Sequence, residues 1–368
     1  MTDVAVIGGG PAGLAIAWRL AGRGARVRLF DPAVGSGAAY AAAGMLAPVA
    51  EAYFGEAALT RLLVAAAARW PHFAAELTAA TGQDLGYRTD GTLIVALTAD
   101  DLAEAERLSA YQAGLGLPVR RLRAGDLRER EPLLAPRVRG GAYAPTDHQV
   151  DPRRLVAALR SAALGVGVEL VPRAVRALDD VAAGTTVVAA GCGLADLTGL
   201  PVRPVKGQVL RLRVAAGDAP VAAGFRHVLR GYVDGRRVYL VPRADGEVVV
   251  GATVEERTDD AVTAGAVLDL LRAATDLVPE LAEYTLAETC VRHRPGTPDN
   301  GPVLGPLPGR PGTLVAGGLY RHGIVLTPLV ADAVAALVAG ESPPEECAPF
   351  GAERFRRAAL AAARGGDG

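Results

Sequence analysis

This chain of 368 residues has few cysteines, a single lysine and no clear excess of acidic or basic residues. The three cysteines, Cys192, Cys290 and Cys347, are odd in number and include no Cys-X-X-Cys pair, which argues against a disulfide framework and fits a reducing compartment. The five histidines are scattered and add no ligand cluster to the cysteines. We therefore expect no bound metal ion.

The charge balance excludes whole classes of partner, since 40 acidic residues stand against 39 basic ones. Such a balance produces no field that would attract nucleic acid or an anionic membrane surface, and it favours a small-molecule ligand. No apolar run reaches the roughly 18 to 20 residues of a membrane span, and the stretch at residues 326–339 is interrupted by Asp332. The first residues show no signal-peptide pattern, so we expect a cytoplasmic protein.

Lysine is nearly absent, because Lys206 stands alone among 39 basic residues that are otherwise arginine. Richness in Ala, Gly and Pro is typical of GC-rich coding, which replaces lysine by arginine wherever a surface charge suffices. Two interpretations of Lys206 stay open. It lies where a planar guanidinium does not fit, near a bound cofactor or its supporting loop, or it is a surface residue retained by chance.

The most specific motif lies at the start of the chain. An apolar strand at residues 3–7 leads into Gly8-Gly9-Gly10-Pro11-Ala12-Gly13, a helical stretch follows, and a second strand at residues 27–30 ends at Asp31. In such a unit the glycines allow a tight turn, close approach of backbone to a pyrophosphate, and close packing of helix on strand. The helix N-terminus offers N–H groups to phosphate, and the acidic residue accepts hydrogen bonds from ribose. The unit predicts a site for FAD or NAD.

The length of 368 residues favours two lobes. Stretches of α/β, mixed and β-rich pattern alternate along the chain, which predicts an α/β fold with a discontinuous Rossmann-like domain and an inserted antiparallel-sheet α+β substrate domain. We assign residues 1–85, 148–206 and 295–368 to the first domain and residues 86–147 and 207–294 to the second. One dinucleotide motif is present, whereas flavin reductases fed by NADPH usually need two, so the electrons are expected to come from the substrate.

Periodicity and turn residues predict the individual elements. Helices are expected at residues 59–81 with an interruption at Pro71, 99–115, 152–164, 265–281 and 327–338. Strands are expected at residues 87–97, at two places within 166–178, and at 185–190, 207–214, 237–242, 247–253 and 313–316. Small side chains at residues 35–46 would let backbone lie against a flat ring system, unless they begin an Ala-rich helix.

Five motifs follow one another in an order typical of one flavoprotein superfamily, namely residues 8–13 (GGGPAG), 41–45 (AAAGM), 205–208 (VKGQ), 294–299 (RPGTPD) and 320–326 (YRHGIVL). From Asp3 to about Leu337 the chain resembles the D-amino-acid oxidase superfamily and, within it, the glycine oxidases of thiamine biosynthesis. The resemblance implies an FAD-binding domain and oxidation of a small amino acid to an imine by hydride transfer to flavin N5. Oxygen would reoxidise the flavin to give hydrogen peroxide, and water would convert the imine to glyoxylate or another keto acid and ammonia.

The resemblance also implies roles for four residues at the substrate. Arg294, in a loop before Pro295-Gly296, would clamp the substrate carboxylate, since a planar guanidinium binds a carboxylate with two hydrogen bonds. Tyr239 would contact the same carboxylate, unless it is an ordinary core tyrosine. Arg321 would touch flavin and substrate, unless it contacts phosphate or solvent. Val254 replaces a larger apolar residue over the substrate, which would enlarge the pocket. The expected catalytic residues are thus Tyr239, Arg294 and Arg321.

The cofactor site implied by the resemblance comprises many backbone positions and small side chains. They are Gly8, Gly10, Pro11, Ala12, Gly13, Asp31, Pro32, Ala38, Ala39, Ala43, Gly44, Met45, Val175, Gly191, Leu319, Tyr320, Arg321, His322, Gly323, Ile324 and Val325. Sarcosine-oxidising relatives attach their flavin through a C-terminal cysteine, and residues 317–326 contain none, so non-covalent FAD is expected. His322 is better explained as a loop residue beside the flavin, and His293 as a residue at a strand end, than as a general base.

The sequence leaves three functional alternatives beside a glycine oxidase. These are a sarcosine or small D-amino-acid oxidase, a flavin dehydrogenase that passes electrons to a membrane quinone, and a silent FAD-binding module. Glycine, sarcosine, D-alanine and D-proline cannot be ranked from the sequence, because pocket volume depends on packing. The oligomeric state and the physiological electron acceptor stay open, although a homo-oligomer is compatible with the sequence.

Overall fold

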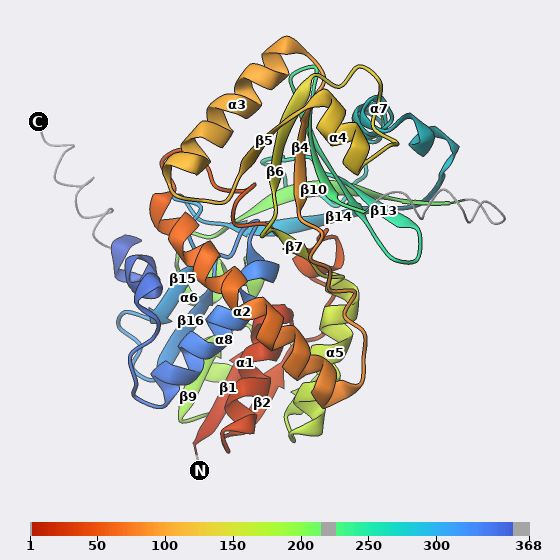
Figure 1. Cartoon of the computed structure of the whole chain (residues 1–368). Coiled ribbons are helices and arrows are strands. Elements are labelled where there is room, and N and C mark those ends of the chain that lie inside the picture. The colour runs from red at the N-terminus through yellow and green to blue at the C-terminus, as the bar shows by residue number, and fades with distance from the viewer. Residues whose placement is uncertain (1, 215–225, 356–368) are drawn as a thin grey trace, which may run out of the picture.

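The computed structural model describes residues 2–214 and 226–355, which form the two lobes visible in Figure 1. Residue 1 and residues 215–225 and 356–368, which the predicted domain ranges include, lie outside the described residues. Within the described chain no helix combines the length and the apolar character that a membrane crossing requires.

The lower lobe in Figure 1 contains the predicted strand–helix–strand unit. Its described strands follow the order β15-β16-β9-β1-β2-β8 and pair in parallel, except that β15 runs antiparallel to β16. Val4 and Val6 of β1 face one core and Ile7 the core on the other side, as expected for a central strand buried on both faces. The strands are β1 (Asp3–Ile7), β2 (Arg26–Phe30), β8 (Glu169–Val171), β9 (Thr185–Val188), β15 (Val303–Pro306) and β16 (Thr313–Gly317).

Helices cover both faces of this sheet. On one face α1, α5 and α8 share a core with the strands, and the long helix α2 packs against α5 and α8. On the other face the short helix α6 contributes Leu194 to a second core. The helices are α1 (Pro11–Gly22), α2 (Ala57–Thr81), α5 (Pro152–Gly165), α6 (Leu194–Thr198) and α8 (Gly323–Val338).

The upper lobe is built on a second sheet with the described order β14-β10-β13-β12-β11-β4-β6-β5. All neighbours pair antiparallel except β11 and β4. One face packs its leucines and valines on α7, which leaves the other face to the cavity described below. The elements are β4 (Thr92–Ala96), α3 (Ala99–Gly114), β5 (Arg120–Arg123), α4 (Ala124–Arg130), β6 (Gly140–Ala144), β10 (Arg203–Arg213), β11 (Val228–Val233), β12 (Arg236–Pro242), β13 (Glu247–Gly251), α7 (Ala264–Leu277) and β14 (Thr285–Gly296).

Short elements complete the described chain. A two-stranded sheet pairs β3 with β7, and short 3-10 helices of three to six residues lie between the larger elements or after them. They are β3 (Met45–Leu46), β7 (His148–Gln149), η1 (Ala38–Tyr40), η2 (Leu178–Asp180), η3 (Gly191–Gly193), η5 (Pro279–Glu283) and η6 (Glu345–Phe350).

The predicted fold class is confirmed, but several elements differ from the prediction. The helix at residues 57–81 is not interrupted at Pro71, because Trp70 and Phe73 hold it in the core and Trp70 Nε1 donates a hydrogen bond of 2.9 Å to Val325 O. Residues 166–178 contain one strand, β8, rather than two, and the strand predicted from residue 87 begins at Thr92. The helix predicted to end at residue 281 stops at Leu277, just before a proline.

Elements that the sequence pattern missed have no clean alternation of apolar and polar residues. β11 contains an Arg-Gly pair, β5 is rich in charged residues, and the first half of β14 is exposed. These segments are strands because they pair with neighbouring strands, which the local sequence pattern does not reveal. The domain ranges stay a prediction. Their boundaries after residues 206 and 294 fall inside β10 and β14.

Candidate functional site

A cavity of about 630 Å³ lies where the loops of the first sheet meet the free face of the second sheet. Its lining comes from the turn after β1, the Ala/Gly-rich stretch before and at β3, η3, and the segment between β16 and α8. The second sheet contributes residues of β10, β11, β12, β13 and β14. Segments far apart in the sequence therefore build one site.

The turn after β1 has the shape of a dinucleotide site. A Cβ on Gly13 would overlap Gly8 O, so this glycine allows the close packing of α1 on β1 that the sequence predicts. A Cβ on Gly10 would meet nothing within 4 Å, and the N-terminus of α1 has no side-chain cap. Backbone N–H groups of this first turn thus face a space where a pyrophosphate fits. Asp31 lines the same end and accepts hydrogen bonds of 2.6 Å from Gly9 N and 2.7 Å from Ala33 N.

Most predicted cofactor residues line the cavity. The exceptions are Gly13, which acts through packing, and Pro32 and Val175, which are not part of the lining. Those that line it are Gly8, Gly10, Pro11, Ala12, Asp31, Ala38, Ala39, Ala43, Gly44, Met45, Gly191, Leu319, Tyr320, Arg321, His322, Gly323, Ile324 and Val325. Only residues 38–40 of the small-residue stretch form a helical turn, so the Ala-rich helix considered as an alternative is not present.

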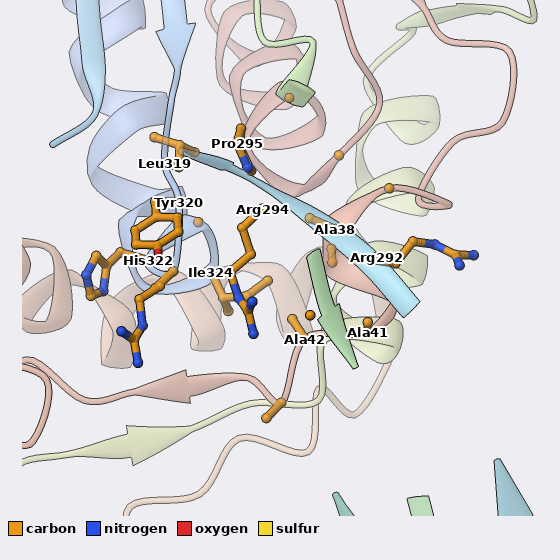
Figure 2. Close-up of a pocket in the computed structure, with 18 of the residues that line it drawn as sticks. Ala38, Ala41, Ala42, Arg292, Arg294, Pro295, Leu319, Tyr320, His322 and Ile324 are labelled. Carbon is orange, nitrogen blue, oxygen red and sulfur yellow. The ribbon is translucent and has the colours of Figure 1, made fainter. Parts of the chain in front are cut away.

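Arg294 extends from β14, and the prediction that a loop presents it is wrong. It pairs with Val205 of β10, and the strand continues through Pro295 because proline is tolerated in an edge strand. Arg294 Nη1 donates to Thr253 O at 3.2 Å and more weakly to Lys206 O at 3.5 Å. Figure 2 shows its guanidinium pointing into the space near Ala42 and Ile324, while Arg292 of the same strand points away.

Two glycines make room for side chains at the end of the cavity that the second sheet lines. A Cβ on Gly207 of β10 would overlap the Arg294 guanidinium, and a Cβ on Gly251 of β13 would overlap the Tyr239 ring. Burial raises the pKa of the Tyr239 hydroxyl, although the nearby arginines, Arg294 first among them, oppose the shift. Burial lowers the pKa of Arg294. Among the described residues no carboxylate forms an ion pair with Arg294, so a cationic fork faces the cavity without an anionic partner.

Two residues of this end were not predicted from the sequence. Glu51 lies 3.8 Å from Arg321 Nε and also forms an ion pair with Arg230, whose side chain comes from β11. Arg230 stands opposite Tyr239 in the β11–β12 register. The sequence gives no reason to select Arg230 among so many arginines, and the strand β11 that carries it was not predicted. Arg321 is therefore not free, but its side chain is 45% exposed and lines the cavity.

Three further predictions concern residues around this end. Val254 lines the cavity and is 55% exposed, which places it at the opening. His322 lines it and is buried, and burial together with Arg321 and Arg230 lowers its pKa to about 3. It is therefore neutral at physiological pH. His293 lies within β14 rather than at a strand end, because β14 continues to Gly296.

Lys206 is fully buried, so the interpretation as a surface residue retained by chance is wrong. It is absent from the cavity lining. Its Nζ donates to Asp259 Oδ1 at 2.7 Å and to Ala261 O at 2.6 Å, while its backbone pairs with Glu255. Lys206 thus fastens the loop that follows β13 to β10, and this loop carries Val254.

Comparison with known proteins identifies the family. The family model described as FAD dependent oxidoreductase matches residues 3–337. The chain belongs to this family. A glycine oxidase of Geobacillus kaustophilus is 36% identical, and the match covers 96% of this chain and 97% of that protein. A candidate thiamine biosynthesis oxidoreductase of Rhizobium etli is 33% identical over 90% of this chain and 95% of its own length.

Solved structures agree with the family assignment. A crystal structure of glycine oxidase from Geobacillus kaustophilus matches with a TM-score of 0.87 and 34% identity, covering 95% of this chain and 98% of that one. The protein is accordingly an FAD-dependent oxidoreductase. The uncapped first turn of α1, the open space at Gly10 and the small residues around Gly44 fit this cofactor.

Proposed function

We propose that the protein oxidises glycine or another small amino acid, with FAD as cofactor and molecular oxygen as acceptor. The observation that carries the proposal is Arg294, a cation that no described carboxylate pairs, in the same cavity as the dinucleotide-binding turn. FAD bound beside the turn after β1 would supply the hydride acceptor for the substrate α-carbon, and molecular oxygen would take up the electron pair with two protons to give hydrogen peroxide. The resulting imine reacts with water to give glyoxylate or another keto acid and ammonia.

The residues of the chain bind and orient the substrate in this proposal. Arg294 holds the carboxylate with two hydrogen bonds, and the Tyr239 hydroxyl donates a third. Held at this end, the substrate keeps its α-carbon in one orientation, and orientation of that kind lowers a barrier without acid–base help. His322 does not act as a base, because its low pKa leaves it a very weak proton acceptor. A substrate that enters with a neutral amine needs no general base.

The relatives support a more detailed proposal. By analogy with the glycine oxidase and the thiamine biosynthesis oxidoreductase named above, the product would supply the thiazole of thiamine, in the cytoplasm. A sarcosine or small D-amino-acid oxidase is the alternative, favoured by the exposed, small Val254 at the cavity opening. A quinone-linked dehydrogenase is a further alternative, and no observation on the described residues favours it.

A substrate panel scored by peroxide release tests the proposal. Purified holoenzyme is mixed in air with glycine, sarcosine, D-alanine, D-proline and a primary amine that has no carboxylate. We expect peroxide in proportion to oxygen consumed with at least one amino acid and much less with the amine. Flavin reduction without peroxide would favour the dehydrogenase. No flavin reduction by any amino acid would overturn the proposal.

A further inference from the structure

The charges that line the cavity do not balance. The arginines of the lining are Arg230, Arg237, Arg292, Arg294 and Arg321, and its carboxylates are Asp31 and Glu51. Asp31 lies at the dinucleotide end, where both of its oxygens accept backbone N–H groups. Glu51 is therefore the carboxylate that the lining places at the substrate end.

Around Tyr239 the cations outnumber the anions by two. Glu51 is shared between Arg230 and Arg321, so one carboxylate faces two guanidinium groups. Arg294 adds a third cation, which no carboxylate of the described chain pairs. Arg237 does not add to this surplus, because Glu104 forms an ion pair with it.

The excess of positive charge is divided between two positions on either side of Tyr239. Arg294 of β14 lies close enough to the Tyr239 hydroxyl to lower its pKa against the effect of burial. Arg230 stands directly opposite Tyr239 on β11, and side chains in such a pair lie side by side on one face of a sheet. Burial lowers the pKa of Arg230, and the neighbouring cations Arg321 and Arg237 lower it further. An arginine nevertheless stays protonated in a protein.

An amino acid with one carboxylate compensates Arg294 and leaves Arg230 and Arg321 to share the single carboxylate of Glu51. We propose that the cavity binds small amino acids that carry a second carboxylate, with Arg294 holding the α-carboxylate and Arg230 together with Arg321 holding the second one. This inference rests on the proposed function and narrows its substrate class. The chemistry is unchanged, since the same C–H bond breaks and the second carboxylate takes no part in the reaction.

Matched substrate pairs that differ by one carboxylate test the inference on the holoenzyme. Sarcosine is compared with iminodiacetate, and D-alanine with D-aspartate, by initial rates of oxygen consumption. We expect kcat/KM to be about 10- to 100-fold higher for the dicarboxylate of at least one pair, the range of a hydrogen-bonded charge pair. Equal or lower values for both dicarboxylates would overturn the inference while leaving the proposed function intact.

Variants distinguish between two roles of Arg230, namely binding of the second substrate carboxylate and interaction with the flavin. Arg230→Gln is expected to lower kcat/KM for the dicarboxylate about tenfold more than for its partner, whereas Glu51→Gln shifts the ratio the opposite way. Arg292→Gln is the matched control, because its guanidinium contacts Ser36 O and Val291 O instead. It should change both members of a pair alike. Equal losses for both members in Arg230→Gln would assign Arg230 to the flavin and overturn the inference.

A binding measurement keeps the inference testable without turnover. The dissociation constants of malonate and acetate are measured by perturbation of the flavin spectrum in the wild type and in Arg230→Met/Glu51→Gln, which removes both partners of the ion pair together. We expect malonate to bind more tightly than acetate, and the double variant to lose this preference. A preference that the double variant retains would overturn the inference. Arg230-dependent malonate binding without oxidation of any amino acid would instead refute the proposed function alone.

Discussion

Arg294 has backbone carbonyls as hydrogen-bond partners, those of Lys206 and Thr253, and no acid within the described chain. Its position is therefore fixed without its charge being neutralised, which suits a residue that receives an anionic ligand. Gly207 supplies the space for the guanidinium, since any larger residue there would overlap it. The structure thus gives a physical reason for the glycine in the VKGQ motif.

Arg294→Ala tests this residue by steady-state kinetics. The substrate carboxylate would lose its partner in a buried site, and truncating one member of a buried charged pair costs roughly 2 to 5 kcal/mol. At about 1.4 kcal/mol per tenfold, kcat/KM falls some thirtyfold to a few thousandfold. Arg294→Lys should recover part of the loss, because an ammonium group cannot make the planar two-bond contact. Full activity of the alanine variant would remove Arg294 from the substrate site.

At the scale of elements, the loop after β13 is held by buried side chains of β10. Lys206 donates to Asp259 and Ala261 O, and Gln208 Nε2 donates to Glu255 Oε1 at 2.7 Å and to Thr263 Oγ1 at 3.2 Å. The same loop accepts from Arg294 through Thr253 O. The anchor Lys206 and the proposed substrate clamp Arg294 therefore contact the same loop.

Lys206→Met should lower the free energy of unfolding by about 1 to 3 kcal/mol, because Ala261 O loses its donor and Asp259 a charged partner. Denaturant unfolding measures this change. Arg257→Met is the control, since Arg257 contacts the same Asp259 from an exposed position, where such pairs contribute about 0 to 1 kcal/mol. Lys206→Arg should slow flavin reduction, because the larger planar group displaces the loop. Unchanged stability of Lys206→Met together with unchanged flavin reduction in Lys206→Arg would refute the anchoring role of Lys206.

Asp147 fixes the turn that carries Glu51. Its buried carboxylate accepts from Val49 N at 3.0 Å and Ala50 N at 3.1 Å, and burial raises its pKa from 3.8 to about 7. The folded state thus binds a proton more readily than the unfolded state. The stabilisation that the proton provides is complete below pH 4 and is lost as the pH rises through 7.

The unfolding free energy of the wild type should therefore fall between pH 5 and pH 8 relative to that of Asp147→Asn, by up to about 1.4 kcal/mol per pH unit. Denaturant unfolding of both proteins across this range measures the difference, in which all other titrating groups cancel. Parallel pH profiles would show that Asp147 does not titrate in this range.

Local pattern predicted the elements where pattern and packing agree, such as β1, α1 and α5. It failed where tertiary pairing creates the element. β14 lies at a sheet edge with polar residues at its exposed end, and Arg230 interrupts the pattern of β11. Sequence motifs mark Gly10, Asp31 and Arg294, and all three line the cavity. Glu51 and Arg230 could not be found from the sequence, because they come from segments far apart in the chain that only the folded structure brings into contact.

At the scale of the whole molecule, the cavity joins the dinucleotide end in one lobe to the sheet face of the other, and its lining includes one cysteine, Cys192. Burial raises the pKa of the Cys192 thiol to about 11, which keeps it protonated and a poor nucleophile at neutral pH. FAD should therefore co-purify with the protein and be released by acid or heat. Flavin absorbance that stays with the precipitated polypeptide would refute non-covalent binding.

Anaerobic flavin reduction tests the central claim most directly. The holoenzyme is mixed without oxygen with each of the small amino acids and, separately, with a primary amine that lacks a carboxylate, in the wild type and in Arg294→Ala. We predict that an amino acid bleaches the wild-type flavin, that air then restores the colour with release of hydrogen peroxide, and that Arg294→Ala slows bleaching by the amino acid far more than by the amine. A flavin that stays oxidised with every amino acid, or equal slowing for amino acid and amine, would contradict the account.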